Sequence, residues 1–172
     1  MREKAFGAWV CAASTALFAV GCGGDGGGGG GGGGVGGGGS NKVDACTIVT
    51  AADATALFGQ TAVKESGAPS TDPALLGECQ WGWSDPSANS HTLQFRVWEG
   101  ASYYVPGSKA EPFAIGDKGA VESDPTWGVD VQWMKGDKVA DLNYSTVGIT
   151  PDASAKVDAV KALALSAAGK IQ

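Results

Sequence analysis

The stretch Thr92-Leu-Gln-Phe-Arg-Val-Trp-Glu99 alternates apolar and polar side chains along most of its length. Successive side chains of a β-strand point to opposite faces, so this alternation predicts a strand with one face in the core. Leu93, Phe95 and Val97 share the predicted buried face. Trp98 falls on the opposite, outer face. A strand that is buried on one side only is typical of an antiparallel sheet.

Further segments on either side of this stretch also have the composition of strands. The segment Cys79-Gln-Trp-Gly-Trp83 precedes it, and the turn-forming residues 85–90 between the two predict an antiparallel hairpin. Three more strands are expected downstream, at residues 114–121, 127–134 and 139–145. Lys135-Gly-Asp-Lys138 supplies the turn between the last two.

A short helix is expected after Cys46. Thr50 is a good N-cap, and Asp53 three residues later completes the pattern of a capping box. Gly59 is the natural end of this helix, because glycine tolerates the left-handed conformation found there. The predicted helix therefore has about two turns.

A longer helix is expected at the C-terminus. Thr150 can cap it, Pro151 suits its first position, and Asp152 favours the positive end of the helix dipole. One apolar stripe follows at helical spacing: Val157, Val160, Leu163, Ala164, Ala167 and Ile171. The predicted fold class is α+β, with a single antiparallel sheet of about five strands packed against a short N-terminal helix and this amphipathic C-terminal helix.

The first residues of the chain have the pattern of an export signal. Arg2 and Lys4 give a positive start, and residues 5–20 form an apolar core. This core is shorter than the roughly 20 apolar residues needed to span a membrane, and no later stretch is long or apolar enough. We therefore expect a lipoprotein signal peptide at residues 1–21.

The processing site assigned to this signal is Cys22. Ala19-Val-Gly-Cys22 resembles the Leu-Ala-Gly-Cys box of bacterial lipoproteins, with alanine in place of the usual leucine. The resemblance implies a diacylglycerol thioether and an N-acyl chain on Cys22, a two-signal membrane anchor. The alternative is an ordinary secretory signal that is cut elsewhere.

Residues 22–41 have the composition of a flexible tether, since 15 of the 17 residues from 23 to 39 are glycine. The remaining residues, 42–172, are enough for one domain. The full chain has a net charge of −6, and removal of Arg2, Glu3 and Lys4 leaves −7. This acidity and the absence of Lys/Arg clusters argue against nucleic acid as a partner.

The cysteines can be assigned by elimination. Cys11 leaves with the signal and Cys22 carries the lipid, so Cys46 and Cys79 remain as a pair in an oxidising setting. We expect a disulfide between them. The weaker alternative is a metal site that also uses His91, the only histidine, but the close ligand spacing of zinc sites is missing.

Three short motifs carry a family resemblance: Cys46-Thr-Ile-Val-Thr50, Leu57-Phe-Gly59 and Cys79-Gln-Trp81. With the helix between the first two, they resemble small bacterial envelope lipoproteins of unknown function, most familiar from actinobacteria. The resemblance runs from residue 46 towards the C-terminus and is specific in its first half. It implies that Cys46 and Cys79 are paired, and it brings no catalytic residues.

Catalysis has little support in the sequence. His91 lies at the entry to a strand, and no Gly-x-Ser-x-Gly motif is present. Asp130 and Asp141 could form a glycosidase pair, but alternation places both on solvated faces of neighbouring strands. We therefore expect no enzymatic activity, no cofactor and no metal.

Tryptophan is abundant in the domain: Trp81, Trp83, Trp98, Trp127 and Trp133. Trp98 is the candidate binding residue, because an outward aromatic ring can anchor a protein or stack on a sugar. The alternative is that the second helix or the loop at residues 67–73 covers that face.

Together, these features predict an exported, lipid-anchored cell-envelope lipoprotein that faces the exterior or periplasm of a bacterial cell. We expect a non-catalytic binding or sensing module, held to the membrane through Cys22 and directed at an envelope protein. The alternatives are a structural accessory of an envelope complex and, with less support, a glycan-binding or hydrolytic protein.

Overall fold

The computed structural model describes residues 42–172 apart from residues 67–69 and 149–152. By its contacts the chain divides into two units, Met1–Gly37 and Gly38–Gln172. All described helices and strands, and the hydrophobic core, belong to the second unit.

The predicted signal peptide at residues 1–21, Cys22 and the tether at residues 22–41 lie outside the described residues. Within the described part, no helix combines the length and the apolar character needed to cross a membrane.

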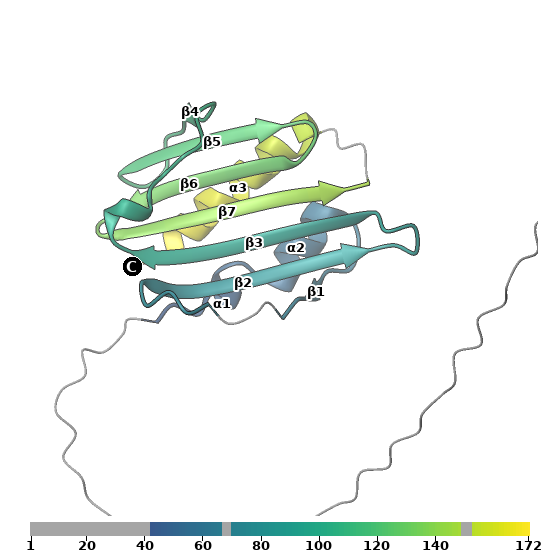
Figure 1. Cartoon of the computed structure of the whole chain (residues 1–172), viewed down its shortest axis with the longest axis horizontal. Coiled ribbons are helices and arrows are strands. Elements are labelled where there is room, and N and C mark those ends of the chain that lie inside the picture. Colours follow the sequence, from purple (N-terminus) through teal and green to yellow (C-terminus); the bar gives the residue numbers. More distant parts are fainter. Residues whose placement is uncertain (1–41, 67–69, 149–152) are drawn as a thin grey trace, which may run out of the picture. The chain divides into compact units, whose positions relative to one another are not determined.

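Seven antiparallel strands form one open sheet in the order β1-β2-β3-β7-β6-β5-β4 (Figure 1). The strands are β1 Val63–Lys64, β2 Leu75–Ser84, β3 Ser90–Glu99, β4 Glu111–Pro112, β5 Lys118–Asp124, β6 Gly128–Lys135 and β7 Lys138–Val147. The α+β class is confirmed, but the sheet has seven strands instead of about five. Its two extra strands are two-residue edge strands, too short to show alternation in the sequence.

The strand expected at residues 114–121 lies further along the chain. Gly116 interrupts it with a left-handed backbone (φ 60°), and a Cβ there would lie 2.1 Å from the carbonyl oxygen of Met134. The Asp117 amide then donates to the same oxygen at 2.8 Å. Strand β5 begins only after this bend, at Lys118.

Strand β3 is an interior strand of the sheet, between β2 and β7. Leu93, Phe95 and Val97 are completely buried, which confirms the face predicted from the alternation. The predicted turn between β6 and β7 is also present: Lys135 pairs with Lys138, and Gly136 has a φ of 62°.

The predicted N-terminal helix is α2, Ala51–Phe58, and a one-turn helix α1, Ala45–Ile48, precedes it. The capping box is confirmed: Asp53 N donates to Thr50 Oγ1 at 3.3 Å, and Thr50 N donates to Asp53 Oδ2 at 2.9 Å. Gly59 ends the helix with a φ of 73°.

The C-terminal helix is α3, Ala153–Lys170. Its expected cap at Thr150, with Pro151 and Asp152, falls outside the described residues. The apolar stripe packs as predicted, and its completely or almost completely buried members are Val160, Ala164, Ala167 and Ile171. Helix α3 contacts β5, β6 and β7, whereas α1 and α2 contact the β2–β3 side.

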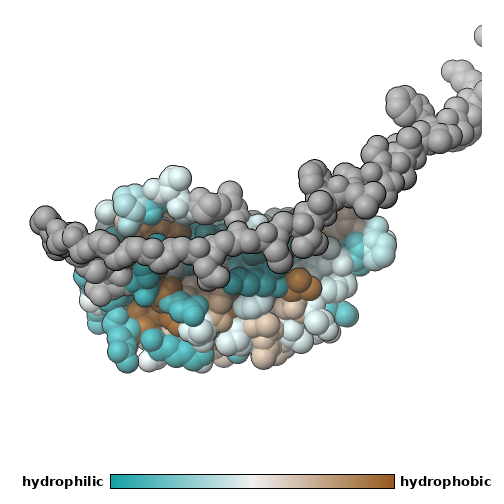
Figure 2. Space-filling model, turned by 90° about the horizontal axis from the view of Figure 1, so that it is seen from below, coloured by the Kyte–Doolittle hydropathy of each residue, from teal (hydrophilic) through white to brown (hydrophobic). Residues whose placement is uncertain are grey.

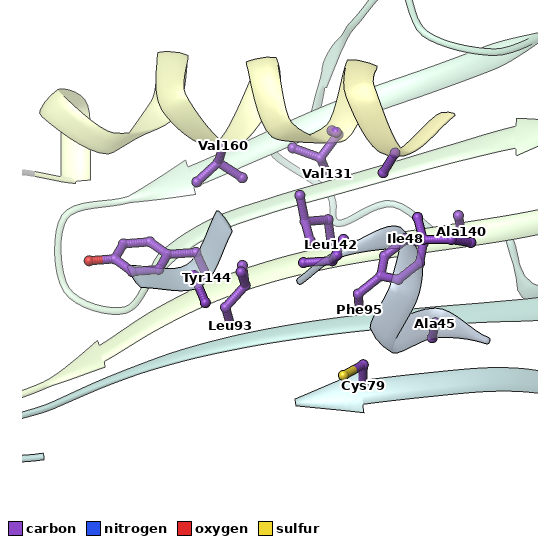
Figure 3. Packing of buried hydrophobic residues seen from close by; sticks show 14 of the residues in the cluster. Ala45, Ile48, Cys79, Leu93, Phe95, Val131, Ala140, Leu142, Tyr144 and Val160 are labelled. Carbon is purple, nitrogen blue, oxygen red and sulfur yellow. The ribbon is translucent and has the colours of Figure 1, made fainter. Parts of the chain in front are cut away.

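All three helices lie on one face of the sheet (Figure 1). We call this the inner face and the opposite one the outer face. The core fills the space between helices and sheet, with Phe95, Leu142 and Val160 among its members (Figure 3). The disulfide between Cys46 and Cys79 joins α1 to β2, which confirms the expected pairing and excludes the metal alternative for these thiols.

Candidate functional site

The outer face of the sheet is polar. Its side chains belong to the strand residues that alternate with the core-facing ones. On β2 and β3 they form an exposed ladder: Gln94 Nε2 donates to Glu78 Oε1 at 2.7 Å and to Gln80 Oε1 at 3.3 Å. The side-chain amide of Gln80 in turn donates a hydrogen bond to the Glu65 carboxylate. Since the helices occupy the inner face, this outer face is where the domain can present fixed polar groups.

The chain itself crosses part of the outer face. After β3 it enters a 3-10 helix, Ala101–Tyr103, and continues to β4 at the far edge of the sheet. We call residues 100–110 the crossover segment. Val105 N donates to Gln132 Oε1 at 3.2 Å, and Lys118 Nζ lies 4.6 Å from the centre of the Tyr104 ring. The crossover segment therefore covers the β6 side and leaves the β2 side open.

Trp98 lies on the outer face and is half-buried. Its ring stacks on Tyr103, with centroids 5.8 Å apart and planes 10° from parallel. The guanidinium carbon of Arg96 lies 5.0 Å from the Trp98 centroid. The cover over Trp98 is thus the start of the crossover segment, not the second helix, which is on the inner face.

Tyr103 links this aromatic pair to a neighbouring loop. Its hydroxyl donates to Asp72 Oδ1 at 3.1 Å, and this hydrogen bond to the carboxylate raises the pKa of Tyr103. Residues 67–73 were the alternative cover; of the described ones, 70–73, Asp72 makes this contact. Sequence reasoning did not anticipate the pairing of Trp98 with Tyr103, although the two are only five residues apart.

A cleft of about 550 Å³ lies beside the aromatic pair, at the edge of β2. It is lined by Lys42, Val43, residues 70–73 and residues 75–78. Two contacts connect it to the pair: Asp72 accepts the Tyr103 hydrogen bond, and Leu75 is the register partner of Trp98. In the sequence, the turn-forming run Ser70-Thr-Asp-Pro73 indicated a loop at this position. It did not show which other segments would line a cleft with that loop.

Asp130 and Asp141 form a second polar centre on the outer face, beside Gln132, which also accepts the hydrogen bond from Val105. Asp141 is only 4% exposed and pairs with Arg96, whose Nη2 lies 3.3 Å from Asp141 Oδ1. Gln132 Nε2 donates to Asp141 Oδ2 at 3.0 Å, and Asn143 Nδ2 donates to Asp130 Oδ1 at 3.3 Å. The expectation that both carboxylates are solvated is therefore wrong.

The electrostatics of this centre follow from burial. Desolvation, and then the negative charge of Asp141, raise the pKa of Asp130 to about 7. Alternation correctly placed both aspartates on the outer face, but it gave no sign that they would be buried there. A carboxyl group with this pKa can hold or release a proton near neutral pH.

His91 lies on the inner face, within aromatic rings. Its Nδ1 is 2.9 Å from the Tyr144 hydroxyl, and its ring stacks on Phe58 with centroids 5.3 Å apart. Burial, and to a lesser extent the charge of Lys156, lower the pKa of His91. Among the described residues no carboxylate bonds to His91, so a Ser-His-Asp arrangement around it has no geometric support.

Comparison of the chain with family models, curated proteins and solved structures gives no match. In the described part, no cluster of three or more His, Cys, Asp or Glu side chains could hold a metal ion.

Proposed function

We propose that the protein is an exported lipoprotein of the bacterial cell envelope, anchored through lipid on Cys22, and that its domain is a non-catalytic binding or sensing module. The signal-like N-terminus and the lipoprotein-type box at Cys22 support export and anchoring. The Cys46–Cys79 disulfide is consistent with a location outside the cytoplasm, because such bonds persist in oxidising compartments.

The observation that carries the binding role is the Trp98–Tyr103 stack beside the β2-edge cleft. Binding sites in proteins are concave and combine apolar surface with a few fixed polar groups. Here an aromatic pair and an ordered Asp72 lie beside a cleft of about 550 Å³ at the edge of β2. The partner is an envelope protein or glycan.

Membrane attachment is tested with Cys22→Ser. The wild-type protein should incorporate a labelled fatty acid and sediment with membranes, whereas Cys22→Ser should do neither. Equal membrane attachment of both proteins would contradict the lipid anchor and leave the secretory alternative.

The binding face is tested by photo-crosslinking in intact cells. A photoreactive residue at Thr92, on the outer face, is compared with one at Asp158, on the exposed side of α3. We expect a specific crosslinked envelope component from position 92 only. Capture from position 158 alone would favour the structural-accessory alternative, in which the helical side docks, and capture from neither would contradict a stable partner.

A further inference from the structure

We propose that the β2-edge cleft binds an uncharged sugar unit of an envelope glycan, such as a hexose or an N-acetylhexosamine. This inference rests on the proposed binding function and names its ligand class. The volume of about 550 Å³ lies within the range of roughly 300 to 1,000 Å³ usual for ligand sites.

The lining of the cleft matches the chemistry of a sugar. Ser70 and Thr71 offer hydroxyl groups, and Asp72 and Glu78 offer carboxylate oxygens. Apolar surface is contributed by Val43, Pro73, Leu75 and Leu76. A sugar ring presents hydroxyl groups at its edge and C–H groups on its faces, so one cleft of this kind can satisfy both.

Asp72 is held ready to accept hydrogen bonds. The Tyr103 hydroxyl and the Ala74 amide both donate to its Oδ1, at 3.1 and 2.9 Å. Its own amide donates to Ser70 Oγ at 3.2 Å. Within the described residues both bonds to the carboxylate end on Oδ1, which leaves Oδ2 to accept from a ligand hydroxyl.

Trp98 then acts as a positioning residue. Its ring already contacts Tyr103 and the Arg96 guanidinium, so it offers a ligand little free aromatic surface. By stacking on Tyr103 it fixes the hydroxyl that orients Asp72. This assigns Trp98 an indirect role in binding.

The negative charge of the cleft favours uncharged sugars over anionic ones. Asp72 and Glu78 give the cleft two carboxylates against the single ammonium group of Lys42. Repulsion disfavours uronic acids and phosphorylated sugars. A neutral sugar unit meets no such repulsion, and its hydroxyl groups can donate hydrogen bonds to both carboxylates.

The surroundings of the cleft disfavour a protein ligand. Protein-binding surfaces have an apolar centre with a polar rim. Figure 2, which looks at the molecule from its β1–β2 side, shows mainly hydrophilic surface with small, separate hydrophobic patches where the domain is visible. The exposed large apolar side chains of the described part, Val63, Val105, Val147 and Leu165, come from four different segments.

The test is an NMR titration of the ¹⁵N-labelled protein with three probes: an N-acetylglucosamine trisaccharide, maltotriose and a glucuronate-containing disaccharide. We expect a neutral probe to shift amides at Lys42 and residues 70–78, with the anionic probe at least tenfold weaker. Asp72→Asn should weaken binding at least tenfold. Asp158→Asn, the same change on exposed α3, should leave it unchanged.

Two more variants separate positioning from folding. Tyr103→Phe keeps the stack but loses the hydroxyl, and should weaken binding several-fold with an unchanged melting temperature. Trp98→Phe, which keeps a stacking ring, should bind better than Trp98→Ala. Equal affinity of Tyr103→Phe and wild type would contradict the positioning role.

The outcomes distinguish this inference from the proposed function. If no neutral probe shifts residues 70–78 while position 92 still captures an envelope component in cells, the sugar inference is wrong and the binding module remains. If the anionic probe binds best, the charge argument is wrong. If neither probes nor crosslinks report binding, both proposals fail.

Discussion

Arg96 and Asp141 form an ion pair across strands β3 and β7, with Nη2 of the arginine 3.3 Å from Oδ1 of the aspartate. This pair compensates the charge of a carboxylate that is only 4% exposed. Asp130 lies on the next strand without a cation of its own among the described residues. The centre formed by Asp130 and Asp141 therefore has one balanced carboxylate and one that is costly to ionise.

Asp130→Asn should stabilise the protein above pH 7. The folded-state pKa of Asp130 is raised from 3.8 to about 7, so its contribution to stability is present below about pH 4 and is lost as the pH rises to about 7. Asparagine removes the charge that Asp141 repels. We expect a gain on the order of 2 kcal/mol at pH 8 and little change at pH 4, from urea unfolding at both values.

The control for this prediction is Asp158→Asn, at an exposed position on α3. It should change the free energy of unfolding by less than about 0.5 kcal/mol at either pH. An equal gain from Asp130→Asn at pH 4 and pH 8 would show that ionisation is not its cause.

The disulfide should contribute substantially to the stability of the domain. Cys46 and Cys79 are 33 residues apart, and closing a loop of this length stabilises a protein by about 3 to 4 kcal/mol in the chain-entropy model. The double variant Cys46→Ser/Cys79→Ser should therefore unfold at a clearly lower urea concentration. Wild type in reductant should approach the variant, and the variant itself should be insensitive to reductant. A wild type that is equally stable with and without reductant would refute the contribution.

His91 should titrate below its ordinary range, because burial beside Phe58 and Tyr144 disfavours the charged ring. Its contribution to stability is complete above about pH 6.5 and declines as the pH falls from there towards the lower folded-state pKa. The chain has one histidine, so its imidazole NMR signals can be followed without variants. A midpoint above 6.5 would contradict the lowered pKa.

The fold was predictable where the signals are local. The capping box of Thr50 and Asp53, the end of α2 at Gly59 and the inner face of β3 all depend on residues close in sequence. The burial of Asp141 could not be predicted this way, because its partners Arg96 and Gln132 come from other strands, β3 and β6. Two-residue edge strands carry no periodic signal at all.

The candidate site was predictable to a similar degree. The outer-face position of Trp98 follows from alternation with period two. Its partners do not: Tyr103 comes from the crossover segment and Asp72 from a loop before β2. A cleft formed by residues 42–43 and 70–78 brings together segments about 30 residues apart, and their contact depends on the paired edge of β2.

Gly77→Ala should disturb one wall of the cleft. Glycine is required here for space, since a Cβ would lie 2.1 Å from the carbonyl oxygen of Val43. The backbone of Val43 must then move away from β2, which weakens the 2.9 Å bond from its amide to the Leu76 carbonyl. We expect a loss of about 1 to 3 kcal/mol on urea unfolding, as is usual for overpacking, and weaker binding of any sugar that uses the cleft. Gly169→Ala is the matched control, because a Cβ there meets nothing within 4 Å and lies in α3, where alanine is the better helix former. Equal effects of the two substitutions would show that the close approach of Val43 does not determine the cost.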